Sequence, residues 1–236
     1  MIGLPDAIRA CLFDLDGVLT QTAKVHAAAW KQMFDEYLEK RAQEAGGEFV
    51  PFDAHDDYDE FVDGLPRLDG VRCFLTSRGI VPDPQTVTEL GDRKNVLVQE
   101  IIARDGVDVY EGSVRYVHAA REAGLACAVV SSSANAKAVL RSVGILDRFD
   151  HVVDGHAVAE GGLKGKPAPD TFLEGARLLG VEPAQAAVFE DALAGVEAGV
   201  AGGFGCVVGV DRVGQSAALR DHGATVVVRD LAELLP

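Results

Sequence analysis

Short apolar runs alternate with amphipathic helical segments over the second half of the chain, and this alternation constrains the fold most. The runs are rich in β-branched residues and read LACAVVSSS at 125–133, AAVFED at 186–191, GCVVGV at 205–210 and ATVVV at 224–228. Helical patterns such as VRYVHAAREAG, AKAVLRSVG and TFLEGARLLG accompany them. Because such alternation is typical of βαβ units, the sequence predicts an α/β fold, with a Rossmann-like parallel sheet covered by helices on both faces.

A helical stretch interrupts this pattern near the N-terminus. One apolar run, IRACLFDL at 8–15, precedes that stretch, and the other runs follow it. The segment HAAAWKQMFDEYLEK forms one helical stripe from residues at four-residue spacing: His26, Trp30, Phe34 and Leu38. Helical patterns resume over Gly70–Gly79 and Gln85–Arg104, whereas Ala45–Asp63 reads mainly as loop. We therefore expect a catalytic core domain of residues 1–21 and 106–236, with a helical cap domain inserted at 22–105.

Composition narrows the range of partners. The 236 residues carry a formal net charge of −15, which argues against nucleic acid or anionic lipid as the main partner. No apolar run approaches the roughly 20 residues of a membrane-spanning helix, and Asp6 and Arg9 interrupt the N-terminal stretch where a signal peptide would be apolar. Four widely spaced cysteines suggest free thiols. We expect a cytoplasmic protein that acts on a small molecule, and nothing in the sequence requires more than a monomer.

Polar residues follow the predicted strands where a parallel sheet binds its ligands. Asp14 and Asp16 end the first run, and two positions apart in extended chain they point the same way. The second run ends in Ser131, Ser132 and Ser133, and a later one ends in Glu190 and Asp191; Lys166 opens a loop before a helix. Clustered carboxylates repel one another unless a cation lies between them, and Mg²⁺ prefers such oxygen ligands. The pattern predicts phosphoryl transfer to an aspartate, with a lysine and Mg²⁺ offsetting the charge.

Each of these signals also has a structural interpretation. Asp-Gly is a common turn, the serines could cap a helix that begins near Asn135, and Glu190-Asp191 could cap the next helix. The functional interpretation rests on four such signals falling in order at the ends of strands and in one loop.

The four motifs together resemble those of the haloacid dehalogenase superfamily, and the chain is most similar to its β-phosphoglucomutase subfamily. FDLDGVL resembles the nucleophile motif, VVSSS the hydroxyl motif, GKPAPDTF the lysine motif and VFEDALAGVEAG the acidic motif. The helical insert resembles the mobile cap of that superfamily. The resemblance implies interconversion of β-glucose 1-phosphate and glucose 6-phosphate, with Mg²⁺ as cofactor and glucose 1,6-bisphosphate as activator.

The resemblance also implies roles for individual residues. Asp14 would be the nucleophile and a metal ligand, while Asp16 would be the general acid and base and give its backbone carbonyl to the metal. Asp191 would bind Mg²⁺, with Glu190 either binding it directly or standing beside it. Ser131 and Lys166 would hold the transferring phosphate.

In the insert, the resemblance places substrate-binding positions at His26, Trp30, Gly64, Arg67 and Lys94. His26 and Trp30 could equally be core residues of the cap. Three residues depart from the family pattern: Gln21, Asp63 and Ala134. Two of these departures remove a positive charge on the sugar side of the site, so they bear on which sugar phosphate is used.

A mutase needs donors for a second phosphate, which a phosphatase does not. Arg67, with Ser133 and Asn135, could supply them, because a guanidinium binds phosphate with two hydrogen bonds. Ser132 is a further candidate substrate-binding residue. This favours the mutase over the alternative, a Mg²⁺-dependent phosphatase acting on a small sugar phosphate. A catalytically inactive binding module would most naturally have lost one of the motif residues, all of which are present. A dinucleotide-dependent oxidoreductase lacks support because no G-x-G-x-x-G follows the first run.

Overall fold

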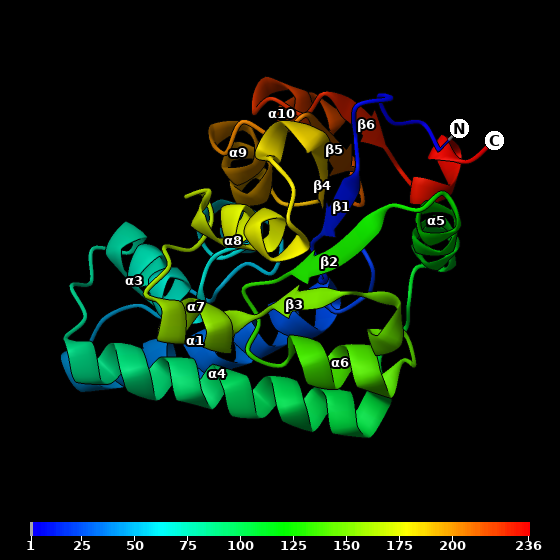
Figure 1. Ribbon diagram of the computed structural model, residues 1–236. Coiled ribbons are helices and arrows are strands. Elements are labelled where there is room, and N and C mark those ends of the chain that lie inside the picture. The colour runs from blue at the N-terminus through cyan, green and yellow to red at the C-terminus, as the bar shows by residue number, and fades with distance from the viewer. Residues whose placement is uncertain (1) are drawn as a thin grey trace. The chain divides into compact units, whose positions relative to one another are not determined.

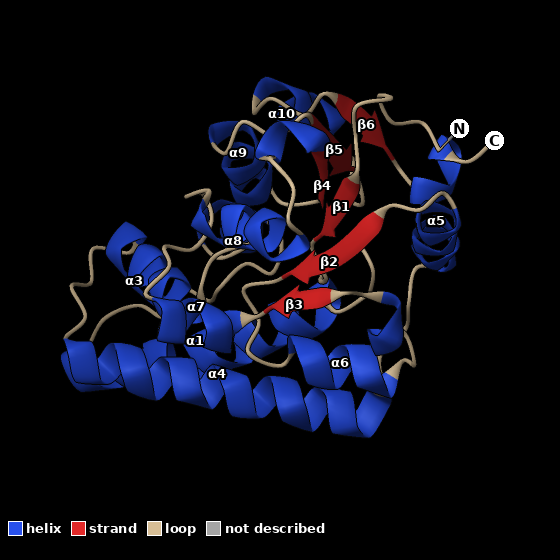
Figure 2. Cartoon of the chain, in the orientation of Figure 1, coloured by secondary structure: helices blue, strands red, loops and turns tan. Residues whose placement is uncertain are grey.

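Six parallel strands form one sheet, and the computed structural model describes them within residues 2–236. The strands are β1 (Ala10–Phe13), β2 (Ala126–Val130), β3 (His151–Val153), β4 (Ala186–Glu190), β5 (Cys206–Val210) and β6 (Val226–Val228). Their order is β3-β2-β1-β4-β5-β6, so β1 lies inside the sheet between two strands that come much later in the chain. Figure 2 shows β3 and β6 at the two edges. The predicted α/β fold with a parallel sheet is confirmed.

Helices cover both faces of this sheet. Six α-helices and one 3₁₀ turn lie among the strands that follow the inserted stretch: α5 (Glu111–Glu122), α6 (Ala136–Ser142), α7 (Gly155–Gly161), α8 (Asp170–Leu179), α9 (Leu193–Ala201), α10 (Ser216–Asp221) and the 3₁₀ turn η3 (Leu231–Leu234). Two further 3₁₀ turns are η1 (Leu146–Arg148) and η2 (Pro183–Gln185). Figure 1 shows α8 and α9 on one side of the sheet and α5 on the other.

The packing explains why the central strands are apolar without alternation. Ala10 and Leu12 of β1 face a cluster with Phe172 of α8, whereas Phe13 points to the other face and stacks on Phe189 at a ring-centroid distance of 4.5 Å. Tyr116 of α5 meets the Phe13 ring edge-on. Because both faces are buried, every residue of β1 is apolar.

Four helices form a separate core in the inserted stretch: α1 (Ala23–Ala45), α2 (Asp56–Phe61), α3 (Arg67–Ser77) and α4 (Pro84–Asp105). The predicted stripe lies on α1. Phe34 from this stripe contacts the rings of Phe52 and Phe74, with centroid distances of 5.3 and 4.2 Å. None of the described helices is long and apolar enough to cross a membrane.

The structure groups the chain into two compact units. The first holds the chain up to Gln21, the segment Gly64–Pro66 and Val107–Pro236; the second holds Thr22–Asp63 and Arg67–Gly106. This division differs from the expected one in two ways. Gly106 belongs to the second unit, and the three residues Gly64–Pro66 belong to the first because they contact its loops. That the two units act as a catalytic core and a cap stays a prediction.

Truncating Phe34 tests the aromatic core of the second unit. Because this side chain is fully buried among other rings, we expect Phe34→Ala to lower the free energy of unfolding by about 3–5 kcal/mol. Urea denaturation followed by circular dichroism measures this loss. Val81→Ala is the matched control, since Val81 is 93% exposed and its truncation should cost less than about 0.5 kcal/mol. Equal losses in the two variants would contradict the assignment of this core.

Candidate active site

The carboxyl ends of β1, β2 and β4 lie at one edge of the sheet. Phe13, the last residue of β1, pairs with Val129 on one side and Phe189 on the other. The backbone N–H of Asp14 then donates to the Phe189 carbonyl at 2.9 Å, which continues the ladder by one residue. The register therefore places Asp14 beside Glu190, the last residue of β4, and level with the end of β2.

Lys166 lies between two of these carboxylates. Its Nζ is 2.5 Å from Oδ1 of Asp14 and 2.5 Å from Oε1 of Glu190, and its side chain is only 1% exposed. It also donates to the Val130 carbonyl at 3.2 Å, and the Phe172 ring lies 4.8 Å from the Nζ. Burial acts to lower the pKa of Lys166, but the charges of Asp14 and Glu190 outweigh it and raise that pKa. Lys166 is therefore a fixed positive charge at the end of β1.

Three carboxylates converge at the same point. Asp14, Glu190 and Asp191 each offer an oxygen, and these oxygens all lie within 4.8 Å of one another. Burial, together with the charges of Glu190 and Asp16, holds the pKa of Asp14 well above its ordinary value, although Lys166 acts in the opposite direction. One lysine cannot balance this many acids, and a set of carboxylate oxygens suits a hard divalent cation. The residues present thus fit a bound metal ion.

The two oxygens of Glu190 have different surroundings. Oε1 is ion-paired with Lys166 but has no hydrogen-bond partner among the described residues, whereas Oε2 accepts a hydrogen bond from the Ala192 N–H at 3.1 Å. Gly195 of α9 leaves room for this side chain, because a Cβ there would lie 1.8 Å from Oε1. Glu190 therefore positions Lys166 whether or not it also touches a metal.

Gly17 gives Asp191 similar room. Its φ of +86° lies in the left-handed region, which side chains rarely adopt, and a Cβ on it would lie 1.7 Å from Oδ2 of Asp191. The Asp-Gly turn after β1 is thus needed both for its backbone conformation and for the close approach of the acidic motif. The structural interpretation of this dipeptide as a turn is therefore compatible with its functional interpretation.

Asp16 and Asp14 have different partners. The Ser131 hydroxyl donates to Oδ2 of Asp16 at 3.4 Å, while Asp14 pairs with Lys166. β1 ends at Phe13 and the chain bends at Leu15, between the two acids; that their side chains point the same way stays a prediction. Oγ of Ser131 also accepts from the Ser133 N–H at 3.0 Å, which fixes the hydroxyl between the two loops.

The other predicted serines stabilise the loop after β2. Oγ of Ser133 accepts from the Asn135 N–H at 3.2 Å, just before α6 begins at Ala136. The Ser132 hydroxyl donates to the Gly64 carbonyl at 2.9 Å. Gly64 in turn faces Ala192, at 3.0 Å from a Cβ placed on it, and has a φ of +70°. Within the first unit, Gly64 therefore contacts both the loop after β2 and the loop after β4, close to Glu190.

The predicted residues of α1 and α4 form a group of their own in the second unit. Nζ of Lys94 lies 2.6 Å from Nδ1 of His26 and 4.7 Å from the centre of the Trp30 ring. Trp30 is 3% exposed and stacks on Phe34. Trp30 is thus part of the core of the second unit, and a substrate-binding role for it stays a prediction. A substrate-binding role for His26 and Lys94 stays a prediction.

Arg67 is the first residue of α3. Its Nη2 lies 3.2 Å from Oδ1 of Asp92, a side chain that is 66% exposed. Its Nε is buried and has no hydrogen-bond partner among the described residues. The guanidinium is thus not fully satisfied by the second unit.

Sequence reasoning missed two residues in the loop after β5. Arg212 donates to the carbonyls of Gly17 and Val18, and Gln215 donates to that of Asp191. The available signal was their place just after the apolar run GCVVGV, at the same edge of the sheet as the other site residues.

The chain is similar to known proteins over nearly all of its length. The family model of haloacid dehalogenase-like hydrolases matches residues 8–203. A β-phosphoglucomutase from Mycobacterium bovis is 56% identical, and the match covers 100% of this chain and 94% of that protein. A β-phosphoglucomutase from Bacillus subtilis is 34% identical, with 96% of this chain and 92% of that protein covered.

A solved structure agrees with these sequence matches. The crystal structure of a β-phosphoglucomutase from Clostridium difficile has a TM-score of 0.78 to this chain at 27% identity, and it covers 96% of this chain and 93% of its own. The resemblance of the four motifs is thereby confirmed over the full length. The chain belongs to the haloacid dehalogenase superfamily, within its β-phosphoglucomutase subfamily, and is a phosphoryl-transfer enzyme of the β-phosphoglucomutase type.

Proposed function

We propose that this enzyme interconverts β-glucose 1-phosphate and glucose 6-phosphate through an aspartyl phosphate at Asp14 and a glucose 1,6-bisphosphate intermediate. The observation that carries the proposal is the buried contact of Asp14 with Lys166 at the end of β1, beside Glu190 and Asp191. A carboxylate held against a fixed cation can accept a phosphoryl group that would otherwise be repelled. The relatives named β-phosphoglucomutase support the choice of substrate.

The residues divide the transfer between them. An oxygen of Asp14 attacks the phosphorus of the bisphosphate, and the bond from phosphorus to the sugar oxygen breaks. Asp16 gives its proton to that leaving oxygen and later removes the proton from the sugar hydroxyl that attacks the aspartyl phosphate. Ser131 and Lys166 donate hydrogen bonds to the phosphoryl oxygens, where charge builds up. The contact between Ser131 and Asp16 supports this pairing of roles.

Mg²⁺ is the proposed cofactor. The oxygens of Asp14 and Asp191, with the backbone carbonyl of Asp16, would hold it, and Glu190 would either bind it directly or stand beside it, paired with Lys166. When bound, the ion offsets the negative charge of the carboxylates and of the phosphoryl group. Glucose 1,6-bisphosphate is the proposed activator, because it phosphorylates Asp14 at the start of the cycle.

A time course of phosphorus NMR tests the proposal. The sample contains the enzyme, β-glucose 1-phosphate, Mg²⁺ and a trace of glucose 1,6-bisphosphate. We expect the starting signal to be replaced by that of glucose 6-phosphate without inorganic phosphate. Release of inorganic phosphate instead would make the enzyme a phosphatase, and an unchanged spectrum would overturn the choice of sugar.

Arg67 tests the mutase against the phosphatase. We propose that its guanidinium, which has a buried and unpartnered Nε, binds the second phosphate of the bisphosphate. Arg67→Ala should therefore lower kcat/KM for the mutase reaction by roughly 100-fold, and lower hydrolysis of a small aryl phosphate by less than about threefold. Arg72→Ala on the same helix is the matched control, since Arg72 is exposed and pairs with the exposed Asp69. Equal losses in both assays would contradict this role.

A further inference from the structure

Arg212 reaches the turn that follows the nucleophile. It comes two residues after β5 ends, and its side chain is only 13% exposed. Its Nε donates to the Gly17 carbonyl at 2.8 Å, and Nη2 donates to the Val18 carbonyl at 3.3 Å. The guanidinium also lies over the ring of Tyr110, with Cζ 3.5 Å from the ring centre. One rigid guanidinium thus binds two backbone carbonyls of the DLDGV turn.

The remaining donors of Arg212 are anchored in the first unit. Nη1 donates to the Arg229 carbonyl at 2.7 Å and lies 3.5 Å from Oδ2 of Asp230, while Nη2 donates to the Ser113 hydroxyl at 3.3 Å. A guanidinium has five N–H donors in a fixed fork, and these contacts engage all three nitrogens. Arg212 is therefore also bound to α5 and to the C-terminal segment, so these contacts hold its guanidinium in place independently of the turn.

Gln215 holds the acidic motif from the same loop. Its Nε2 donates to the backbone carbonyl of Asp191 at 3.0 Å. Asp211 fixes the loop itself, because its Oδ1 accepts from the N–H groups of Gly214 and Gln215 at 2.6 and 2.8 Å, and its Oδ2 accepts from the Ser216 hydroxyl. One internally bonded loop thus contacts two separate catalytic segments.

Those two segments touch one another at the site. Oδ2 of Asp191 would lie 1.7 Å from a Cβ on Gly17, so the acidic side chain rests directly on the backbone that Arg212 binds. A shift of either segment by a fraction of an ångström changes the separation between Asp14 and Asp191. The loop after β5 fixes both positions.

We propose that residues Asp211–Ser216 form a brace that sets the spacing between the nucleophile turn and the acidic motif, with Arg212 and Gln215 as positioning residues for phosphoryl transfer. The proposal rests on the proposed transfer to Asp14. In this proposal neither side chain contacts the substrate. Their effect is on the rate of the chemical step, because that step requires closely placed groups.

Kinetics of three variants test the brace: Arg212→Ala, Gln215→Ala and the double variant. Each single variant should lower kcat by roughly 10- to 100-fold and change KM by less than about twofold. Because the two side chains act through one spacing, the loss in the double variant should be clearly smaller than the product of the two single losses. Arg212→Lys should recover only part of the activity, since an ammonium lacks the fork that binds two carbonyls.

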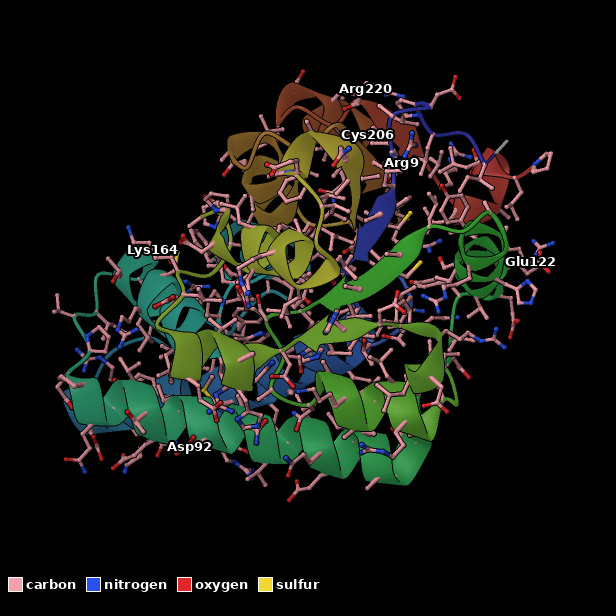
Figure 3. All side chains as sticks on the ribbon, viewed as in Figure 1. Arg9, Asp92, Glu122, Lys164, Cys206 and Arg220 are labelled. Carbon is pink, nitrogen blue, oxygen red and sulfur yellow. The ribbon has the colours of Figure 1, made fainter. Side chains whose placement is uncertain are left out.

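Hydrogen exchange provides a readout that does not depend on turnover. The peptide that contains Gly17 to Thr20 should exchange faster in Arg212→Ala than in the unmodified enzyme, because the turn loses its fixed support. Arg9→Ala is the matched control. Arg9 also donates to backbone carbonyls, those of Asp6 and Ile8, but it lies at the amino end of β1, away from the site (Figure 3).

Each outcome bears on the brace separately from the proposed function. Unchanged kcat and unchanged exchange in Arg212→Ala would overturn the brace and leave the function standing. A rise in KM alone would overturn it too, because it would mean that the residues bind substrate. If the unmodified enzyme transfers no phosphoryl group, the proposed function fails. Faster exchange of the turn in a folded Arg212→Ala variant would then still show that Arg212 stabilises the turn. Should Arg212→Ala not fold, Gln215→Ala, which removes a single hydrogen bond, decides the question.

Discussion

Replacing Asp14 with asparagine should abolish phosphoryl transfer, with a loss of kcat of roughly 10,000-fold or more. The amide has nearly the shape of the carboxylate but lacks its nucleophilic charge, so the aspartyl phosphate cannot form. The backbone contact to Phe189 is independent of the side chain and remains. The phosphorus NMR time course measures the loss. In addition, mass spectrometry after incubation with glucose 1,6-bisphosphate should find the phosphorylated chain in the unmodified enzyme only.

The same variant should remain folded. It removes one of three carboxylates whose oxygens lie within 4.8 Å of one another, so repulsion in the metal-free protein falls rather than rises. We expect its circular dichroism spectrum to match that of the unmodified enzyme. Asp147→Asn, at an exposed position in η1, is the matched control and should keep full activity. Turnover by Asp14→Asn above about 1% of the control would exclude Asp14 as the nucleophile.

Replacing Lys166 with methionine should both destabilise the protein and nearly stop catalysis. The fully buried ammonium bridges Asp14 and Glu190, and its removal leaves two buried carboxylates facing each other. Breaking a buried ion pair from one side costs about 3–5 kcal/mol of folding free energy. Loss of a charged donor to the transferring phosphate should lower kcat by roughly 100- to 1,000-fold.

Two measurements separate these effects of Lys166→Met. Urea denaturation in the absence of Mg²⁺ gives the loss of stability, and turnover at saturating substrate gives the loss of rate. Lys40→Met is the matched control, because Lys40 is 76% exposed and lies 3.9 Å from Glu44, so its removal should cost less than about 1 kcal/mol. A fully active Lys166→Met variant would contradict both the proposed role and the electrostatic description of the site.

The sequence was sufficient to predict the strands that are buried on both faces. β1, β2, β4 and β5 appear as continuous apolar runs because each has helices above and below it. β3 was missed, since it has three residues, lies at an edge and begins with the exposed His151. α7 was missed as well, because this helix has only seven residues and none of its side chains is fully buried.

The site shows the same limit. Asp14, Lys166 and Glu190 could be brought together from sequence because parallel strands end at one edge and charged residues there stand out. Trp30 could not be placed, since burial and ligand contact select the same aromatic residue on a helical stripe. Arg212 was missed because its place just after GCVVGV was the one signal, and the contacts that join it to the nucleophile turn are to backbone carbonyls, which every residue has.

The hollows at Gly17 and Gly195 have a consequence for how this sequence can vary. Each glycine does no chemistry, yet the space left by its missing side chain is filled by the carboxylate of Asp191 or Glu190. Even alanine at either position would push a catalytic acid out of place. In a library of all single substitutions selected for growth on the enzyme's substrate, these two glycines should tolerate as little change as the acids themselves. Substitution in this protein is therefore limited both by the reactive groups and by the glycines that leave room for them.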